Sequence, residues 1–290
     1  MVRVVVTGGN GLVGHEVIHQ LAEQGDEVIC LGRKPPETFN ETVRFVEADL
    51  GQALECSSLP DRVDAVIHLA QSARFNEFPA GARDMFAVNI AAPISLLDWA
   101  RQAGVRSFVH ASSGGLYGNG AEPFKETAPL QIPKRLAFYL STKHAIEQLA
   151  AAYGEHFSVV ALRYFFVYGD RQRRTMLMPR LVTNVREGNV ITLQGADGMR
   201  INPVHVRDAA AAAIAAAKKE VAGVINVAGP DVVSLRQIAE TIGEHIGRSP
   251  VFQSIEGAPG HLIADTEQMR QRLCIQTVSV SAGLESLCKA

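Results

Sequence analysis

Short apolar runs alternate with stretches of helical periodicity through the first 165 residues of the chain. Apolar runs that fit strands lie at 2–6, 27–31, 44–46, 65–69, 107–111 and 159–162. Most are continuous, which is typical of strands covered on both faces. Helical spacing lies between them, most clearly over 84–103 and 136–153. This alternation predicts an α/β fold with a parallel sheet that has helices on both faces.

The first apolar run leads directly into a glycine-rich turn. Residues 7–14 read Thr-Gly-Gly-Asn-Gly-Leu-Val-Gly, and apolar residues at helical spacing follow. The first glycines allow backbone angles that a Cβ forbids. Gly11 lets a pyrophosphate approach the backbone, and Gly14 lets the helix pack close to the strand. Strand, glycine turn and helix in this order predict a Rossmann-type, doubly wound dinucleotide-binding unit.

The pattern becomes less regular after residue 165. Polar loops lie at 170–175 and 195–202, short strands at 190–193 and 224–227, and helices near 178–187, 208–219 and 234–246. We expect a dinucleotide-binding domain over 1–165 and a smaller, mixed α/β substrate-binding lobe over 166–290. The boundaries between the two are expected to be interleaved.

Composition excludes several classes of partner. The chain has 290 residues, with 28 basic and 30 acidic side chains, so its charge argues against nucleic acid or an anionic membrane as a partner. Its four cysteines are far apart and lack C-x-x-C spacing, so no metal site or disulfide framework is expected. No apolar stretch has transmembrane length, and no signal peptide is visible, so we expect a cytoplasmic protein.

Two elements suggest proton-transfer chemistry. Tyr139 and Lys143 are four residues apart and share one face of a predicted helix. A phenol titrates near pH 10, and a nearby ammonium lowers its pKa, so such a pair can exchange a proton with an alcohol oxygen. Ser113 follows the apolar run 107–111 and can hydrogen-bond the same oxygen.

With these motifs the chain resembles the extended short-chain dehydrogenases/reductases of the NAD-dependent epimerase/dehydratase family, most of which act on nucleotide sugars. The resemblance runs nearly end to end. The segments that carry it are 7–14, 48–50, 64–70, 88–90, Ser113 with Tyr139 and Lys143, 162–169, 204–208 and 223–229.

The resemblance implies a role for each matching residue. Ser113, Tyr139 and Lys143 would be catalytic, and Lys143 would also bind the nicotinamide ribose. Cofactor-binding residues would be Thr7, Gly8, Gly11, Leu12, Val13, Gly14, Arg33, Asp49, Leu50, Leu69, Ala70, Gln71, Asn89, Tyr139, Lys143, Tyr164 and Phe165. Substrate-binding residues would be Ser113, Gly114, Phe166, Arg174 and Arg207.

Three departures from the family pattern bear on the expected reaction, cofactor and substrate. Dehydratases of the family carry an acidic pair where this chain has Gly114 and Gly115, so a 4,6-dehydratase is not expected. The second strand ends in Gly32 and Arg33 rather than in the Asp that accepts from the ribose of NAD, which favours NADP while NAD stays possible. Phe166 replaces the Asn that lies beside many sugars, which favours a different or more apolar substrate.

The resulting hypothesis is an NAD(P)-dependent epimerase of a nucleotide sugar, that is, an isomerase that works by oxidoreductase chemistry. An NADPH-dependent reductase of a keto-sugar or another carbonyl compound is the alternative, and a non-catalytic cofactor-binding protein is a third. The three arginines of 170–174 can meet a diphosphate or face solvent. By analogy with the family we expect a homodimer through 84–103 and 136–153, with close approach at Ala145 and 150–152.

Overall fold

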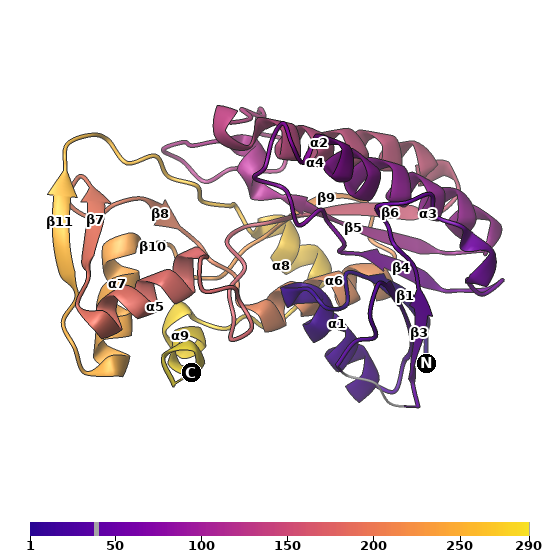
Figure 1. Cartoon of the computed structure of the whole chain (residues 1–290), viewed down its shortest axis with the longest axis horizontal. Coiled ribbons are helices and arrows are strands. Elements are labelled where there is room, and N and C mark those ends of the chain that lie inside the picture. Colours follow the sequence, from indigo (N-terminus) through magenta and orange to yellow (C-terminus); the bar gives the residue numbers. More distant parts are fainter. Residues whose placement is uncertain (38–40, 290) are drawn as a thin grey trace.

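A seven-stranded parallel sheet organises the larger part of the molecule (Figure 1). The computed structural model describes residues 1–37 and 41–289. The strand order is β3-β2-β1-β4-β5-β6-β9. The bounds are β1 Arg3–Thr7, β2 Glu27–Gly32, β3 Val43–Glu47, β4 Ala65–His68, β5 Ser107–Ser113, β6 Ser158–Tyr164 and β9 Gly223–Val227. The order reverses direction between β1 and β4, which is where ligands bind in sheets of this type.

Helices cover both faces of this sheet, as the continuous apolar runs predict. Val4 and Val6 of β1 pack toward one face and Val5 toward the other. In Figure 1 helices α1 and α6 lie below the sheet, and α2, α3 and α4 lie above it. The bounds are α1 Leu12–Glu23, α2 Ala82–Phe86, α3 Ala92–Gln102, α4 Ala137–Ala151, α6 Val206–Lys218 and α8 Glu267–Leu273, with a π-helical turn at Ala87–Ala91 joining α2 to α3. The predicted doubly wound Rossmann-type fold is confirmed.

A smaller group of elements forms its own core at the left of Figure 1. Its helices are α5 Leu177–Glu187, α7 Leu235–Ile246 and α9 Val280–Lys289; its strands are β7 Val190–Gln194, β8 Arg200–Ile201, β10 Val233–Ser234 and β11 Val251–Ile255. A capping box of Ser234 and Gln237 starts α7, and Gly247 in the left-handed conformation ends it. Short 3₁₀ turns lie at Cys56–Ser58, Gly114–Tyr117, Lys134–Leu136 and Ala152–Glu155.

The chain passes between the two parts several times after residue 165. Helix α6 and strand β9 return to the large sheet, and Met269 and Leu273 of α8 join the core below it. Helix α9 then packs with α5 and α7 through Val280 and Leu284. The C-terminal half therefore contributes both to the large sheet layer and to the smaller core.

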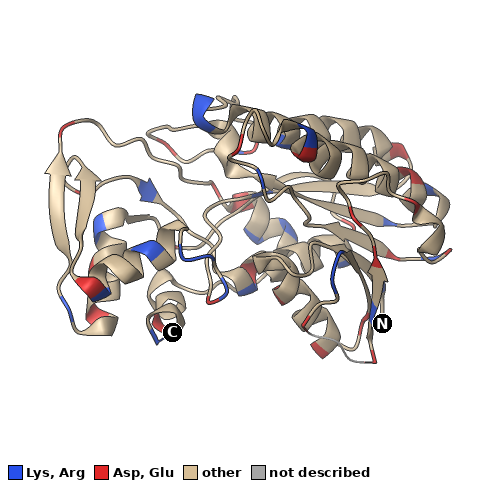
Figure 2. Ribbon diagram, viewed as in Figure 1, with Lys and Arg blue, Asp and Glu red and all other residues tan. Residues whose placement is uncertain are grey.

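Basic and acidic residues are interspersed along the ribbon in both parts of the molecule (Figure 2). All four cysteines are free. Across residues 1–37 and 41–289, no helix has both the length and the apolarity needed to span a bilayer. The same residues contain no group of three or more His, Cys, Asp or Glu side chains placed to hold a metal ion.

Candidate functional site

The glycine-rich turn between β1 and α1 leaves no room for side chains. Gly8 has a φ of +75°, and a Cβ there would lie 2.7 Å from the backbone nitrogen of Ala70. A Cβ on Gly14 would lie 2.1 Å from the carbonyl oxygen of Gly8. Helix α1 begins with Leu-Val-Gly, which contains no acidic residue, and no described side chain caps this end. Its first N–H groups are therefore available to an anion, so this cradle fits a dinucleotide pyrophosphate.

Thr7 joins the turn to the neighbouring strand. Its Oγ1 accepts a hydrogen bond from the backbone nitrogen of Ala70 (3.2 Å) and lies 2.9 Å from Nδ1 of His68. Burial, with a smaller effect of Lys143, lowers the pKa of His68 to about 3. The imidazole is therefore neutral, and its Nδ1 can accept the Thr7 hydroxyl proton. The Thr7 side chain thus connects β1 to β4 rather than pointing outward.

The loop after β2 lies beside the glycine turn. Arg33 is exposed, and the side-chain amide of Asn10 donates to the carbonyl of Lys34 (2.9 Å). After β3, Leu50 is buried, and the Asp49 carboxylate accepts from the Gly51 nitrogen (3.0 Å). These residues follow neighbouring strands, so they share the edge of the sheet at which the glycine turn lies.

Helix α4 brings Tyr139 and Lys143 to the carboxyl end of β5. The ammonium of Lys143 donates to the Ala111 carbonyl (2.8 Å) and lies 5.8 Å from the centroid of the Tyr139 ring. The Tyr139 hydroxyl donates to Oε1 of Gln71 (3.0 Å). Ser113, at the end of β5, accepts from the Gly115 nitrogen through its Oγ (3.1 Å). The three side chains expected to be catalytic therefore come from adjoining elements at the carboxyl edge of the sheet.

The pKa values at this cluster differ from the sequence-based expectation. Burial raises the pKa of Tyr139 above its ordinary value, whereas we expected a nearby ammonium to lower it. Burial also lowers the pKa of Lys143 to about 8, against an opposing effect of Glu147. Desolvation by the surrounding protein is the main cause of both shifts, although Tyr139 is only half-buried, and the Lys143 ammonium is bound to a carbonyl.

A buried ion-pair network supports the cluster from behind, and sequence reasoning missed it. Glu147, one helical turn after Lys143, accepts two hydrogen bonds from Arg163 of β6, with N–O distances of 3.0 and 2.7 Å. Ser112 also donates to Glu147. Arg163 donates to the Tyr117 hydroxyl (2.7 Å). The network thus connects α4 to β5, β6 and the turn after Ser113. The spacing of Lys143 and Glu147 on one helix face was the available signal.

Asn89, expected to contact the cofactor, has both ends of its amide engaged within the protein. Its Oδ1 accepts from the Ser72 nitrogen, and its Nδ2 donates to Oγ1 of Thr142, both at 2.9 Å. The side chain is buried at the π-helical turn. Asn89 therefore connects the loop after β4 to α4.

Gly114 and Phe165 occupy one space between them. A Cβ on Gly114 would lie 2.5 Å from Cε2 of the Phe165 ring, which is itself buried. A Cβ on Gly115 would lie 3.2 Å from Leu140, where contact is tight but the neighbour is flexible. An acidic side chain at position 114 therefore cannot enter unless Phe165 moves. This gives a physical reason for the absence of the dehydratase pair.

The residues after β6 have unusual local geometry. Phe166 has a φ of +45°, a conformation that bulky side chains rarely adopt. The preceding Tyr164 hydroxyl donates to the carbonyl of Ala209 in α6 (3.1 Å), which directs it toward that helix. Backbone strain of this kind persists where the surrounding structure imposes it, and it clusters at functional sites.

The two arginines expected to bind substrate come from different segments. Arg174 is exposed in the loop after Gly169. In the same loop Arg171 forms an ion pair with Glu37 (2.6 Å). Arg207 lies in the first turn of α6, where its carbonyl accepts from Gln20 of α1 (3.0 Å). It therefore lies on the α1–α6 side of the sheet, while Tyr139 lies on the α4 side.

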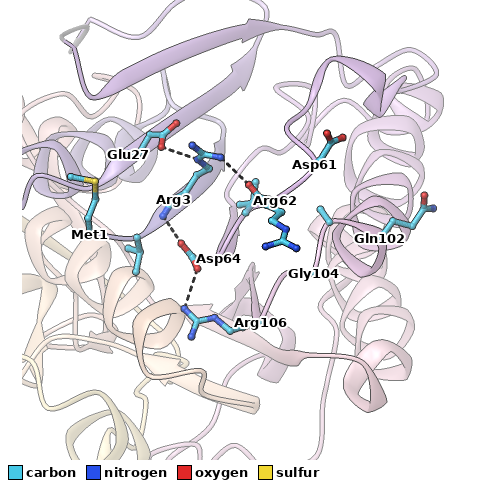
Figure 3. A pocket seen from close by; sticks show the side chains of 12 residues that line it. Met1, Arg3, Glu27, Asp61, Arg62, Asp64, Gln102, Gly104 and Arg106 are labelled. Carbon is cyan, nitrogen blue, oxygen red and sulfur yellow. Dashed lines mark hydrogen bonds and ion pairs between the residues drawn. The ribbon is translucent and has the colours of Figure 1, made fainter.

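An open hollow of about 600 Å³ lies at the opposite edge of the sheet (Figure 3). Four of its charged side chains are engaged in ion pairs. Arg3 bonds to Glu27 (2.8 Å), and Asp64 accepts from the Arg3 nitrogen (2.7 Å) and from Arg106 (3.2 Å). Because ligands of doubly wound sheets bind at the carboxyl ends of the strands, we assign the site to the Tyr139 edge.

The two stacked histidines under this edge predict acid sensitivity. Burial lowers the pKa of both His68 and His110, whose ring centroids are 5.8 Å apart, so both are neutral in the folded protein. Below about pH 6.5 they protonate in the unfolded chain. Their contribution to the free energy of unfolding therefore falls by about 2.7 kcal/mol per pH unit as the pH drops from 6 to 4.5.

Urea unfolding across this pH range tests the prediction with His110→Phe. The variant should lose stability less steeply on acidification, by about 1.4 kcal/mol per pH unit. His19→Phe is the control, because His19 is exposed on α1. Parallel curves for wild type and His110→Phe would contradict the assignment.

Comparison with known proteins gives a consistent result. Residues 4–228 match the NAD dependent epimerase/dehydratase family. The chain is similar to a UDP-glucose 4-epimerase of Corynebacterium glutamicum (28% identical, covering 93% of this chain and 89% of that protein). It is also similar to a UDP-glucuronate 4-epimerase of Thermodesulfobacterium geofontis (27% identical, covering 84% and 80%).

Two similar solved structures contain NAD. One is UDP-glucuronic acid 4-epimerase from Bacillus cereus in complex with NAD, with a TM-score of 0.84, 26% identity, and coverage of 98% of this chain and 96% of that one. The other is MoeE5 in complex with UDP-glucose and NAD, with a TM-score of 0.79, 27% identity, and coverage of 99% and 97%.

Proposed function

Because the chain belongs to the NAD-dependent epimerase/dehydratase family and is an enzyme of the extended short-chain dehydrogenase/reductase type, we propose that it interconverts two epimers of a nucleotide sugar. The observation that carries the proposal is the convergence of Tyr139, Lys143 and Ser113 at the sheet edge where the glycine turn lies. The 4-epimerases among the relatives support a reaction at the sugar C4.

The chain's own residues would manage the proton. A bound nicotinamide supplies the hydride acceptor and donor. Tyr139 would take the proton of the sugar hydroxyl in the oxidising half of the reaction and return a proton to the same oxygen in the reducing half. Ser113 donates a hydrogen bond to the same oxygen. Lys143 would bind the nicotinamide ribose and would supply positive charge near the phenolate, which a base with a burial-raised pKa requires.

The remaining assignments follow the same proposal. The dinucleotide would lie along the large sheet, on the glycine turn and the residues that follow β2, β3 and β4, with the substrate between this layer and the smaller core. Leu12, Val13 and Leu69 would line its phosphates and ribose, and Tyr164 and Phe165 would contribute further cofactor contacts. Phe166 would border the substrate. A 4,6-dehydratase is disfavoured, because Phe165 fills the space beside Gly114.

One assay tests the proposal against a reductase, which Arg33 and Phe166 favour. The purified protein is incubated with UDP-glucose or UDP-glucuronate and a trace of NAD(P), and epimers are separated by chromatography. An epimerase converts many equivalents of sugar per cofactor, because each turnover regenerates the cofactor. If one NADPH is consumed for each product molecule, the epimerase proposal is overturned and the reductase is favoured.

Cofactor choice is predicted to favour NADP over NAD. Gly32 supplies no carboxylate for a ribose 2′-hydroxyl, and the exposed Arg33 can bind a 2′-phosphate. Calorimetry should give a lower Kd for NADP, and Arg33→Ala should weaken NADP about tenfold while leaving NAD nearly unchanged. NAD binding at least as tight as NADP in the wild type would refute the role of Arg33.

A homodimer through α2, α3 and α4 is also predicted. The two charged residues of α4, Lys143 and Glu147, are both buried, so its outer face carries no Lys, Arg, Asp or Glu. Phe86 is 57% exposed and Leu149 45% exposed on this surface. Ala150, expected at the interface, instead packs in the core. Light scattering at micromolar concentration should give twice the monomer mass, and Leu149→Glu should give monomers; a monomeric wild type would refute the dimer.

A further inference from the structure

The Tyr139 hydroxyl has a defined partner in the protein itself. It donates to Oε1 of Gln71 at 3.0 Å. Gln71 lies three residues after the end of β4, and the ring of Phe75 in the same loop lies 5.5 Å from the Tyr139 ring. The Ser113 Oγ accepts from the Gly115 nitrogen, so it is oriented by its own turn. The phenol is therefore held by the loop after β4.

Buried hydrogen bonds hold the two ends of this contact together. Next to Gln71, the Ser72 nitrogen donates to Oδ1 of Asn89, and the other end of that amide donates to Thr142. Thr142 in turn donates to the backbone carbonyl of Tyr139 (2.6 Å). Ser72, Asn89 and Thr142 are each at least 90% buried. These bonds connect the backbone next to Gln71 to the backbone of Tyr139, so they hold the Gln71 backbone within reach of the phenol, while the Gln71 side chain itself is exposed.

We propose that Gln71 is a positioning residue for Tyr139 in both protonation states of the phenol; the inference rests on the proposed function of Tyr139. A neutral phenol donates a hydrogen bond, whereas a phenolate only accepts. A glutamine amide offers an acceptor oxygen and a donor nitrogen. Rotation of the amide group by half a turn therefore lets it accept from the phenol or donate to the phenolate. A glutamate in its place can do only the first, and a methionine of similar length can do neither.

Kinetics of Gln71→Glu and Gln71→Met test this role. The carboxylate of Gln71→Glu disfavours the phenolate. The rising limb of the plot of kcat/KM against pH should therefore move to higher pH by about one pH unit or more. Gln71→Met should lower kcat about tenfold with little change in KM. Gln271→Glu, at an exposed position of α8, is the matched charge control and should follow the wild type. A Gln71→Glu profile that superimposes on the wild-type profile would overturn the proposal.

A second measurement needs no substrate. The chain has five tyrosines, so ¹³Cζ-labelled tyrosine gives five NMR signals, and Tyr139→Phe identifies one of them. In Gln71→Met the Tyr139 signal should shift while the other four stay. An unmoved Tyr139 signal would overturn the contact, whatever the activity. A protein with no epimerase turnover but a shifted signal would refute the proposed function and leave the contact standing.

Discussion

Tyr139→Phe should fold and bind cofactor like the wild type, yet lose on the order of a hundredfold or more in turnover. The variant keeps the ring against Phe75 and removes only the hydroxyl that donates to Gln71. The general acid–base group is therefore deleted without a cavity. Steady-state kinetics, with the cofactor Kd measured on the same preparation, separate loss of chemistry from loss of binding.

Variants of Ser113 and Lys143 should show smaller or different losses than Tyr139→Phe. Ser113→Ala should cost less than Tyr139→Phe, because it removes one hydrogen bond to the reacting oxygen. Lys143→Ala should lower both turnover and cofactor affinity, since Lys143 is proposed to serve both. Near-wild-type turnover in Tyr139→Phe would show that another residue moves the proton.

Glu147→Gln should be the most destabilising of the variants considered, by about 3–5 kcal/mol. The substitution keeps the size of the side chain and removes the charge that Arg163 binds through two hydrogen bonds. Both side chains are buried, so the guanidinium is left without a counter-charge where water cannot replace it. Urea unfolding at pH 7 gives the difference in free energy directly.

A double variant distinguishes the loss of a pair from the loss of packing. Glu147→Met with Arg163→Met removes both charges at similar volume and should recover much of the stability lost in Glu147→Gln. Glu155→Gln, at an exposed position beyond α4, is the control and should be neutral. A loss below about 1 kcal/mol in Glu147→Gln would mean that water reaches this site.

The sheet was predictable because its strands are continuous apolar runs that need no partner to be recognised. The strands β1 to β6, the glycine turn and the Tyr139–Lys143 pair all follow from local sequence. The two-residue strand β8 lies in what we expected to be a loop, and β11 and α9 were not predicted. Strand β11 is largely exposed, and among the strands in the described residues β7 is its one partner, so it lacks the buried pattern that identifies a strand.

Features that depend on distant residues could not be read from the chain. The pairing of Glu147 with Arg163 and the shared space of Gly114 and Phe165 join segments on different elements. The raised pKa of Tyr139 has the same origin, since burial is a property of the packed structure. A motif identifies which groups meet; the degree of desolvation, which decides their charge, appears only once the elements pack.

The shared space of Gly114 and Phe165 also limits how this sequence can change during evolution. An acidic residue at position 114 alone would collide with the Phe165 ring. Shortening Phe165 alone would leave a cavity costing about 3–5 kcal/mol. Each step is harmful unless the other has already occurred, so the two sites are epistatic. An acid beside Ser113 would therefore require a stabilised ancestor or a coupled double substitution. A fitness valley thus separates this sequence from one that could carry out elimination.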